Sequence, residues 1–225
     1  MKGLAKHTEK IIDAVSNLNS ISPYVLVGGT ALSLQLDHRQ SEDFDFMRWS
    51  SRKGEKMEVD WFNIEKELKT IGQVQKTDLL GFDHVQFVVE DVKFSFYACE
   101  RFSPVKKTLP FLNNIVIADI DSIAAMKMEV LLRRTNFRDY YDLYCIMQTK
   151  SPIEIKGLIN DALKYSDHNL SSRNLLTILT TGERFIVDDG FTKLAPKYDI
   201  TSNQIEEYMK TVVRNAYLSE EMTMK

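Results

Sequence analysis

The stretch VGGTAL at residues 27–32, followed by SEDFDF at residues 41–46, decides how this chain is expected to fold. A β-branched and aromatic segment, 24–27, precedes the glycines, and residues 31–36 after them are typical of a helix. The expected order is therefore strand, tight turn and helix. Glycines let a backbone approach a bulky anion, and the free N–H groups at a helix start favour negative charge. The turn is consequently a candidate phosphate site.

The Gly-Gly-Thr turn by itself has two interpretations. It lacks the GxxxxGK[ST] spacing of a P-loop and the third glycine of a dinucleotide fingerprint, so neither of those sites is indicated. The first interpretation is a site for a triphosphate. The second is a plain left-handed turn in which Thr30 caps the helix that follows.

Asp43 and Asp45 alternate with apolar residues in the period of a half-buried strand. They then share one face, with side-chain roots roughly 6.6 Å apart. At that separation two negative charges repel by about 2.5 kcal/mol at an effective dielectric constant of about 20. A cation such as Mg²⁺ offsets the repulsion and shares its other positions with phosphates and water. The alternative is an edge strand with a solvated polar face, which the nearby glycine turn makes the weaker interpretation.

The run GGTALSLQLDHRQSEDFD at residues 28–45 resembles the AbiEii/AbiGii toxin family of the nucleotidyltransferase superfamily, whose members read GGTAL, then HR, then S-x-D-x-D. A second block resembles the K, R and RD-x-x-DL pattern of the same family: Lys127, Arg134, Arg138-Asp139 and Asp142-Leu143. Together the blocks span about residues 20–150 of the chain.

The resemblance implies a polymerase-β-like nucleotidyltransferase core that binds Mg²⁺ and the triphosphate of an incoming NTP. Asp43 and Asp45 would ligate the metal. Lys127 and Arg134 would neutralise developing phosphate charge, and Asp142 would be a base or an orienter of that Lys/Arg group. The nucleotide-binding residues implied by the resemblance are Gly28, Gly29, Thr30, Arg134 and Arg138. His38, together with Arg39, could contact substrate or fix the loop ahead of Asp43.

The second block also has a physical interpretation of its own. Lys127 lies in a segment, 117–132, that is apolar around most of a helix. A buried ammonium needs a counter-charge or a bound anion, unless its stem lets it reach water. If the helix continues through Asn136, positions 127, 134, 138 and 142 fall within about 80° of one another, as in a wall facing phosphate.

Two alternatives to that wall are local. Residues 135–136 could break the segment and begin a second helix, so that the block is shared between two helices. Arg138 and Asp139 could also form a structural ion pair with each other.

One strand departs from the superfamily pattern. Many of these nucleotidyltransferases carry a third carboxylate on a later strand, and the segment 92–97 offers Ser95 there, flanked by Asp91 and Glu100. This puts two-metal catalysis in doubt. It is compatible with a site for one Mg²⁺ delivered with the nucleotide, and also with an inactive relative.

Composition narrows the class of protein. The chain has 225 residues, of which 44% are hydrophobic, and a net charge of −3 with a pI near 5.9. Proteins that depend on bulk nucleic-acid affinity are usually basic, so any RNA contact should be local. Two cysteines fit a reducing compartment, and residues 1–18 are unlike a signal peptide or a membrane span. We expect a cytoplasmic protein without membrane association.

Strands early and helices late predict an α+β fold, with a polymerase-β-like core of mixed sheet followed by a helical C-terminal lobe. We place the nucleotidyltransferase core at residues 1–118 and the lobe at 119–225, although one domain remains an alternative. Beyond the first strands, a helix is expected at 61–71, strands at 73–77, 84–90 and 92–99 with a tight turn at Glu90-Asp91, and helices at 119–133, 137–149, 152–164, 171–179 and 201–218.

The sequence therefore predicts a Mg²⁺-dependent, toxin-like nucleotidyltransferase that moves a nucleoside monophosphate from an NTP to a hydroxyl of RNA, tRNA included, or of a protein. An antitoxin would be its partner. The alternatives are a phosphotransferase on the same fold and a catalytically inactive module that binds a nucleotide or a partner.

Overall fold

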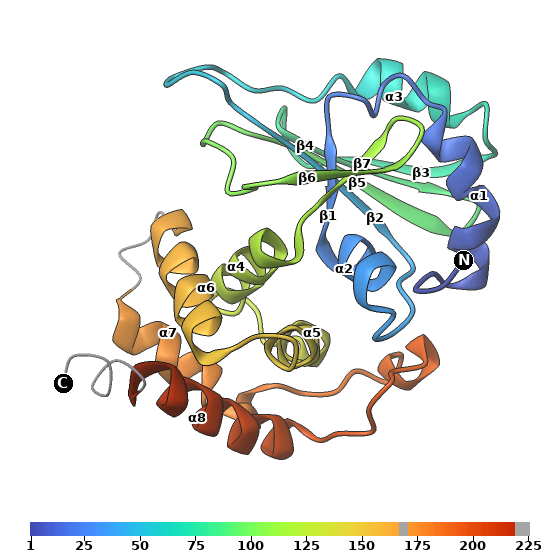
Figure 1. Cartoon of the computed structure of the whole chain (residues 1–225). Helices are drawn as coiled ribbons and strands as arrows, with labels where there is room; N and C mark the ends of the chain where they lie inside the picture. The colour runs from blue at the N-terminus through green and yellow to red at the C-terminus, as the bar shows by residue number, and fades with distance from the viewer. Residues whose placement is uncertain (167–170, 219–225) are drawn as a thin grey trace. The chain divides into compact units, whose positions relative to one another are not determined.

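The computed structural model describes residues 1–166 and 171–218 and divides into two compact units, Met1–Asp119 and Ile120–Lys225. The first unit is a mixed β-sheet with helices, and the second is helical (Figure 1). The predicted α+β class is confirmed. The finer division into domains 1–118 and 119–225 stays a prediction. Within the described ranges, no helix is long and apolar enough to cross a membrane.

The first unit contains three helices and a seven-stranded sheet. In chain order these are α1 (Lys6–Ser16), β1 (Val25–Val27), α2 (Gly28–Leu36), β2 (Phe44–Trp49), α3 (Trp61–Leu68), β3 (Val74–Leu79), β4 (His84–Val89), β5 (Val92–Cys99), β6 (Thr108–Leu112) and β7 (Ile115–Ala118). The strand order is β3-β4-β5-β2-β1-β7-β6. The β2/β5 and β1/β7 pairs are parallel and the other neighbours are antiparallel.

Aromatic side chains join β2 to β5 on one face of the sheet. The register places Phe44 beside Phe94 and Phe46 beside Phe96, and in each pair the ring centroids are 5.2 Å apart. All four rings are at most 1% exposed. Because successive side chains of a strand point to opposite faces, the residues between them, such as Asp45, lie on the other face.

The β4–β5 connection is a two-residue hairpin. Val89 pairs with Val92, and the intervening Glu90 and Asp91 have φ values of 51° and 63°. Two consecutive positive φ angles define the turn whose twist matches that of the flanking strands. The predicted tight turn at Glu90-Asp91 is confirmed.

The interpretation of segment 117–132 as apolar around most of a helix is wrong at its start, although the helix predicted at 119–133 is present as α4. Ile115–Ala118 forms β7, which pairs with β1 through Leu26 and Ile117, and α4 begins only at Ile120. Neither β6 nor β7 was predicted. A four-residue apolar segment has the same hydrophobic pattern in a buried strand and in a buried helix, and only its pairing with β1 and β6 decides.

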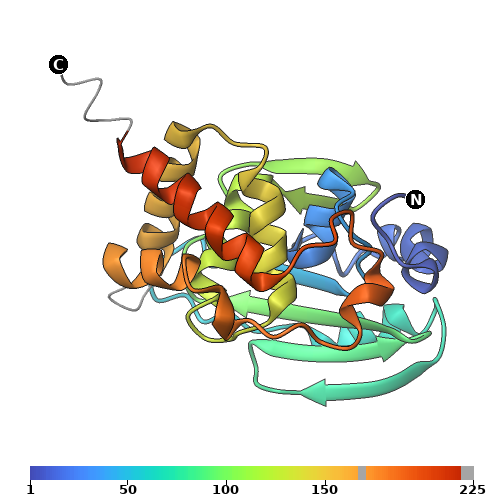
Figure 2. The same ribbon diagram turned by 90° about the horizontal axis from the view of Figure 1, so that it is seen from below.

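In its described residues, 120–166 and 171–218, the second unit contains five helices and two short 3₁₀ segments. These are α4 (Ile120–Val130), α5 (Phe137–Met147), α6 (Pro152–Tyr165), α7 (Ser172–Leu179), η1 (Gly182–Arg184), η2 (Phe191–Leu194) and α8 (Ser202–Leu218), and the five helices correspond to those predicted. Figure 2 shows α8 lying across α5 and α6, against which it packs. Buried aromatic contacts add to this core, among them Tyr140 on Phe185 with ring centroids 4.1 Å apart.

The helical pattern breaks between α4 and α5: α4 ends at Val130 and α5 begins at Phe137, with Asn136 at its N-cap position. The interpretation as one continuous helix through Asn136 is therefore wrong. The alternative, in which the polar block is shared between two helices, is the one observed.

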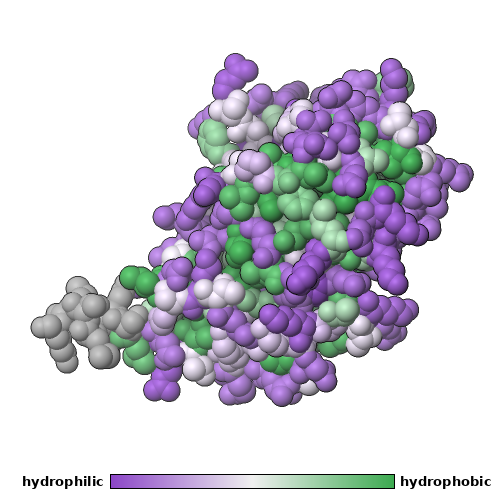
Figure 3. All heavy atoms as spheres, turned by 45° about the vertical axis from the view of Figure 1, so that its right-hand side comes forward, coloured by the Kyte–Doolittle hydropathy of each residue, from purple (hydrophilic) through white to green (hydrophobic). Residues whose placement is uncertain are grey.

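Large apolar side chains are also exposed on the first unit. Figure 3 shows one face of the molecule on which hydrophobic side chains gather between hydrophilic ones. The exposed residues of this kind in the sheet unit include Trp61, Phe62, Leu79, Leu80 and Phe82, the last being 83% exposed. Burial rather than hydrophobicity alone therefore separates the aromatic residues that stabilise the sheet from those that do not.

We expect Phe46→Ala to lower the free energy of unfolding by about 3–5 kcal/mol, because it leaves a cavity between β2 and β5. Phe82→Ala is the matched control and should change stability by less than about 0.5 kcal/mol. Urea unfolding of the two variants beside the wild type measures both values. Equal losses in the two variants would contradict the role given to the β2–β5 aromatic pairs.

Candidate functional site

The two glycines at the start of α2 let charged groups lie against the turn. Gly28 has a φ of +69°, and a Cβ placed on it would lie 2.7 Å from Asp45 Oδ2. A Cβ on Gly29 would lie 2.6 Å from Arg39 Nη2. At position 28 both the positive φ and the close approach of Asp45 favour glycine, whereas at position 29 a Cβ would displace the end of the Arg39 side chain. The start of α2 is therefore bordered by the Asp45 carboxylate beside Gly28 and by the Arg39 guanidinium beside Gly29.

Thr30 fastens the loop that leads to the carboxylates. Val27, in an extended conformation, occupies the N-cap position of α2, so the interpretation of Thr30 as the helix cap is wrong. The buried Thr30 hydroxyl lies 2.9 Å from Ser41 Oγ and also contacts the backbone carbonyl of Asp43. Thr30 therefore sets where β2 begins relative to α2. Direct contact between Thr30 and a phosphate stays a prediction.

Asp43 and Asp45 are held at the start of β2 by the burial of their neighbours. Phe44 is 0% exposed, whereas both aspartates are partly exposed. Asp43 Oδ2 lies 2.9 Å from Lys93 Nζ on β5. Asp45 is in register with Val27 on one side and Ser95 on the other. The carboxylates therefore border the glycine turn from the exposed face of the sheet.

The two carboxylates fit a magnesium ion that brings its own ligands. Across residues 1–166 and 171–218 the structure contains no group of three or more His, Cys, Asp or Glu side chains that could hold a metal. Mg²⁺ usually keeps several waters and binds through one or two carboxylates together with substrate phosphates. Asp43 and Asp45 can supply that protein share, and no all-protein metal cage is needed.

Ser95 is the residue level with Asp45 on β5, and it is engaged with a histidine. Its Oγ lies 3.2 Å from His84 Nε2, and Gln86 Nε2 lies 3.4 Å from the same ring nitrogen. Burial lowers the pKa of His84 below its usual value, with Asp83 acting weakly in the opposite direction, so the imidazole is neutral at pH 7. A hydroxyl and a neutral ring thus stand where the superfamily pattern has a carboxylate.

Sequence reasoning missed Lys93 and His84. Both lie on strands that were predicted, and their positions alternate with buried residues, so the pattern assigns them to the exposed face. Their pairing with Asp43 and Ser95 depends on the register of β5 against β2 and β4, which no local pattern contains.

In the second unit, Lys127 is buried against two carboxylates. Its Nζ lies 2.9 Å from Asp139 Oδ1 and 2.6 Å from Asp142 Oδ2, and its side chain is 7% exposed. The ammonium is therefore paired inside the protein, and the interpretation in which it reaches water is wrong. Arg134 Nε lies 2.7 Å from Asp139 Oδ2. Asp139, which was not predicted as a site residue, contacts both cations.

Arg138 lies outside this cluster. Its Nη2 is 3.1 Å from Asp188 Oδ2, and both side chains are partly exposed. The predicted local ion pair between Arg138 and Asp139 is wrong, because Arg138 turns to Asp188 while Asp139 binds Lys127 and Arg134. An exposed pair of this kind contributes little to stability.

The structure thus brings the predicted site residues together in two sets, each within one unit. The first unit gathers the glycine turn, Thr30 and the two carboxylates of the DxD motif around the start of α2. The second unit gathers Lys127, Arg134 and Asp142 around Asp139.

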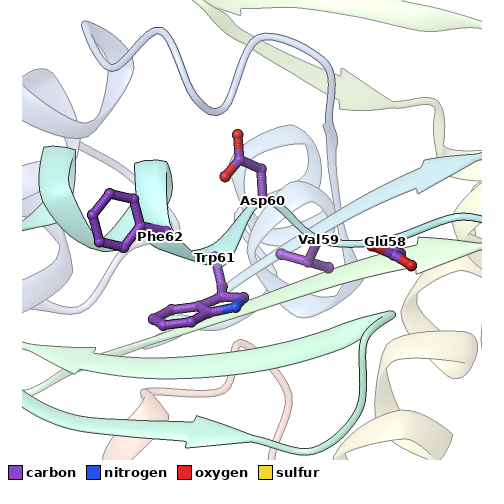
Figure 4. Close-up of a pocket in the computed structure, with 5 residues that line it drawn as sticks. All are labelled: Glu58, Val59, Asp60, Trp61 and Phe62. Carbon is purple, nitrogen blue, oxygen red and sulfur yellow. The ribbon is translucent and has the colours of Figure 1, made fainter.

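A separate pocket of about 520 Å³ lies at the start of α3. Figure 4 shows its lining residues Glu58 to Phe62 following one another along the chain, with the Asp60 carboxylate and the Trp61 ring on opposite sides of the backbone. The Asp60 side chain caps α3 by accepting a hydrogen bond from the Asn63 N–H. This pocket contains none of the predicted site residues.

Comparisons with known proteins identify the family and support the fold. The family model described as nucleotidyl transferase AbiEii toxin, type IV TA system, matches residues 11–215. The uncharacterised protein aq_aa25 of Aquifex aeolicus is 26% identical over 219 residues, which cover 95% of this chain and 98% of that protein.

Two crystal structures from Helicobacter pylori have a similar fold. JHP933 gives a TM-score of 0.56 at 18% identity, covering 98% of this chain and 97% of that one. A proposed nucleotidyltransferase from the same organism gives 0.55 at 18% identity, covering 99% of each chain. At this level of identity the likeness establishes the fold alone.

We expect Gly28→Ala to weaken Mn²⁺ binding about tenfold or more, because the new Cβ would displace the Asp45 carboxylate. Gly54→Ala is the matched control: Gly54 also has a positive φ, +76°, but a Cβ there meets nothing within 4 Å. Both variants carry the same kind of backbone strain, so only the contact with Asp45 differs. Mn²⁺ titration followed by electron paramagnetic resonance measures the affinity, and unchanged binding by Gly28→Ala would refute the prediction.

Acid should weaken the cluster around Asp139. Burial raises the pKa of Asp139, but the charges of Lys127 and Arg134 and their hydrogen bonds outweigh it, and the pKa lies below its usual value of 3.8. A lowered folded-state pKa gives stability that is present above about pH 4 and is lost as the pH falls through the folded pKa.

Asp139→Asn should therefore lower the free energy of unfolding by about 1.5–3 kcal/mol at pH 7 and by less at pH 3. Asp199, an exposed residue of the same unit, provides the control: Asp199→Asn should leave the free energy of unfolding unchanged at both pH values. Urea unfolding at the two pH values provides the comparison. A deficit of the same size at both would show that the charge of Asp139 is not what stabilises the cluster.

Proposed function

Because the chain belongs to the nucleotidyl transferase AbiEii toxin family of type IV toxin–antitoxin systems, we propose that it transfers a nucleoside monophosphate from an NTP to a hydroxyl of RNA, tRNA included, or of a protein. The observation that carries the proposal is the approach of Asp45 to the Gly28 turn, where a Cβ would lie 2.7 Å from Asp45 Oδ2. It brings the helix start that would bind phosphate next to a carboxylate that would bind the metal. Family membership also implies an antitoxin partner.

The glycine turn would bind the triphosphate. The first N–H groups of a helix have no acceptor within the helix and can donate to phosphate oxygens, and the helix dipole favours negative charge there. The Arg39 guanidinium beside Gly29 adds positive charge at the same place. Asp43 and Asp45 would hold Mg²⁺, which, when bound, neutralises phosphate charge and polarises the phosphorus that is attacked.

The proposed reaction is an in-line displacement. The acceptor oxygen forms a bond to the α-phosphorus, the bond to the bridging oxygen breaks, and pyrophosphate leaves with the electron pair while the hydroxyl proton passes to solvent. The chain contributes positioning and charge neutralisation rather than a covalent intermediate. We assign Lys127 and Arg134 to the neutralisation of phosphate charge.

Asp142 has an orienting role in this proposal. Asp142 is completely buried and lies 2.6 Å from Lys127. Both observations favour a role in positioning the ammonium rather than in removing a proton from a substrate. Asp139 holds the same ammonium and the Arg134 guanidinium. Both carboxylates are therefore positioning residues.

Ser95 is the observation that keeps a second candidate in view. A hydroxyl beside Asp45 is compatible with a module that binds a nucleotide without turnover. A phosphotransferase would use the same turn and carboxylates on the γ-phosphoryl group.

The test is incubation with each α-labelled NTP, Mg²⁺ and either total tRNA or cell lysate, in which macromolecules should acquire label. Asp45→Asn should lower the transfer about 100-fold or more, because it removes charge stabilisation at the reacting group. Asp78→Asn, a carboxylate on β3 paired with Lys76, is the control and should transfer normally. Transfer from γ-labelled NTP alone would identify a phosphotransferase, and triphosphate binding without transfer would identify the inactive module.

A further inference from the structure

Lys93 places a positive charge beside Asp43, one of the two carboxylates that would hold the metal. Its Nζ lies 2.9 Å from Asp43 Oδ2, and the side chains of Lys93 and Asp43 are 43% and 35% exposed. An ammonium has three hydrogens to donate. One can serve Asp43 while the others face a ligand that enters from the exposed side.

The sheet register makes this placement systematic. The pairing of Phe44 with Phe94 sets Lys93 beside Asp43, and the next step sets Ser95 beside Asp45. At the two positions of β5 that lie beside the carboxylates, where further metal ligands could be placed, the chain has an ammonium and a hydroxyl. In the part of the chain that the structure describes, Asp43 and Asp45 belong to no larger group of metal-ligating side chains.

The charges favour one metal ion over two. A pair of divalent cations a few ångströms apart repel each other strongly and need several carboxylates to hold them. Here Lys93 already offsets part of the negative charge of the carboxylate pair. The remaining charge suits a single divalent cation accompanied by phosphate, and a second divalent cation beside Asp43 would be repelled by Lys93.

We propose that this site binds one divalent cation and that the Lys93 ammonium supplies the second positive centre, in contact with the triphosphate. The inference rests on the proposed function, since it assigns a residue of the same site. Lys93 would replace the charge of a second metal ion with a fixed charge of the chain. Because the ammonium comes from β5, it is in place before the nucleotide arrives.

Equilibrium dialysis with labelled Mn²⁺ and labelled inorganic triphosphate tests the inference without requiring transfer. The wild-type chain should bind one Mn²⁺ with each triphosphate. Lys93→Met should weaken triphosphate binding at saturating Mn²⁺ about tenfold or more, as expected for the loss of a charge-assisted hydrogen bond. Lys93→Arg, which keeps the charge, should restore most of the affinity.

Lys76→Met is the control, because Lys76 on β3 is also paired with an aspartate, Asp78, at 2.6 Å, and its side chain is 63% exposed. It should bind triphosphate as the wild type does. Urea unfolding of each variant shows whether the chain is folded, and Lys93→Gln replaces Lys93→Met if the latter is not.

Two Mn²⁺ per triphosphate, or undiminished triphosphate binding by folded Lys93→Met, would overturn the inference. The outcome is separable from that of the proposed function. One bound Mn²⁺ and a dependence on Lys93 without nucleotidyl transfer would leave the inference standing and remove the function. Transfer that proceeds with two Mn²⁺ would do the reverse.

Discussion

The parallel pairing of β2 with β5 is the constraint on which the rest of the sheet unit depends. Four phenylalanine rings meet on one face of these strands and are almost completely buried. Because a strand alternates its side chains, burial of the rings forces the intervening polar residues to the opposite face. A slip of one residue would bury the carboxylates and expose the rings, so the free energy of the core also fixes the position of the candidate site.

The glycine turn complements this constraint from the side of α2. Asp45 and Arg39 approach the first two residues of the helix so closely that a side chain on either glycine would collide with them. Thr30 fastens the loop between helix and strand by its contacts with Ser41 and Asp43. These contacts fix the positions of the sheet, the turn and the loop relative to one another. The charged groups near the turn are therefore ordered already, and a bound ligand would lose little free energy to ordering them.

The helical unit contains buried charged side chains that must be paired. An ammonium at Lys127 is tolerated only because Asp139 and Asp142 both contact it and because Arg134 balances the additional carboxylate. Buried ionic clusters of this kind rarely increase stability over apolar packing.

Sequence alone determined the local elements and the faces they present: the strand–turn–helix around Gly28, the alternation at Asp43 and Asp45, the Glu90-Asp91 turn and the five later helices. These depend on periodicity and turn chemistry within a few residues. Tertiary structure decided the strands β6 and β7, the pairing of Lys93 with Asp43, the contact of Ser95 with His84, and the choice of Asp139 over Arg138 as the centre of the second cluster. The cluster around Asp139 joins residues of α4 and α5, and the other contacts join neighbouring strands. All of these contacts depend on strand register or helix packing, which the residue order within a single helix or strand does not specify.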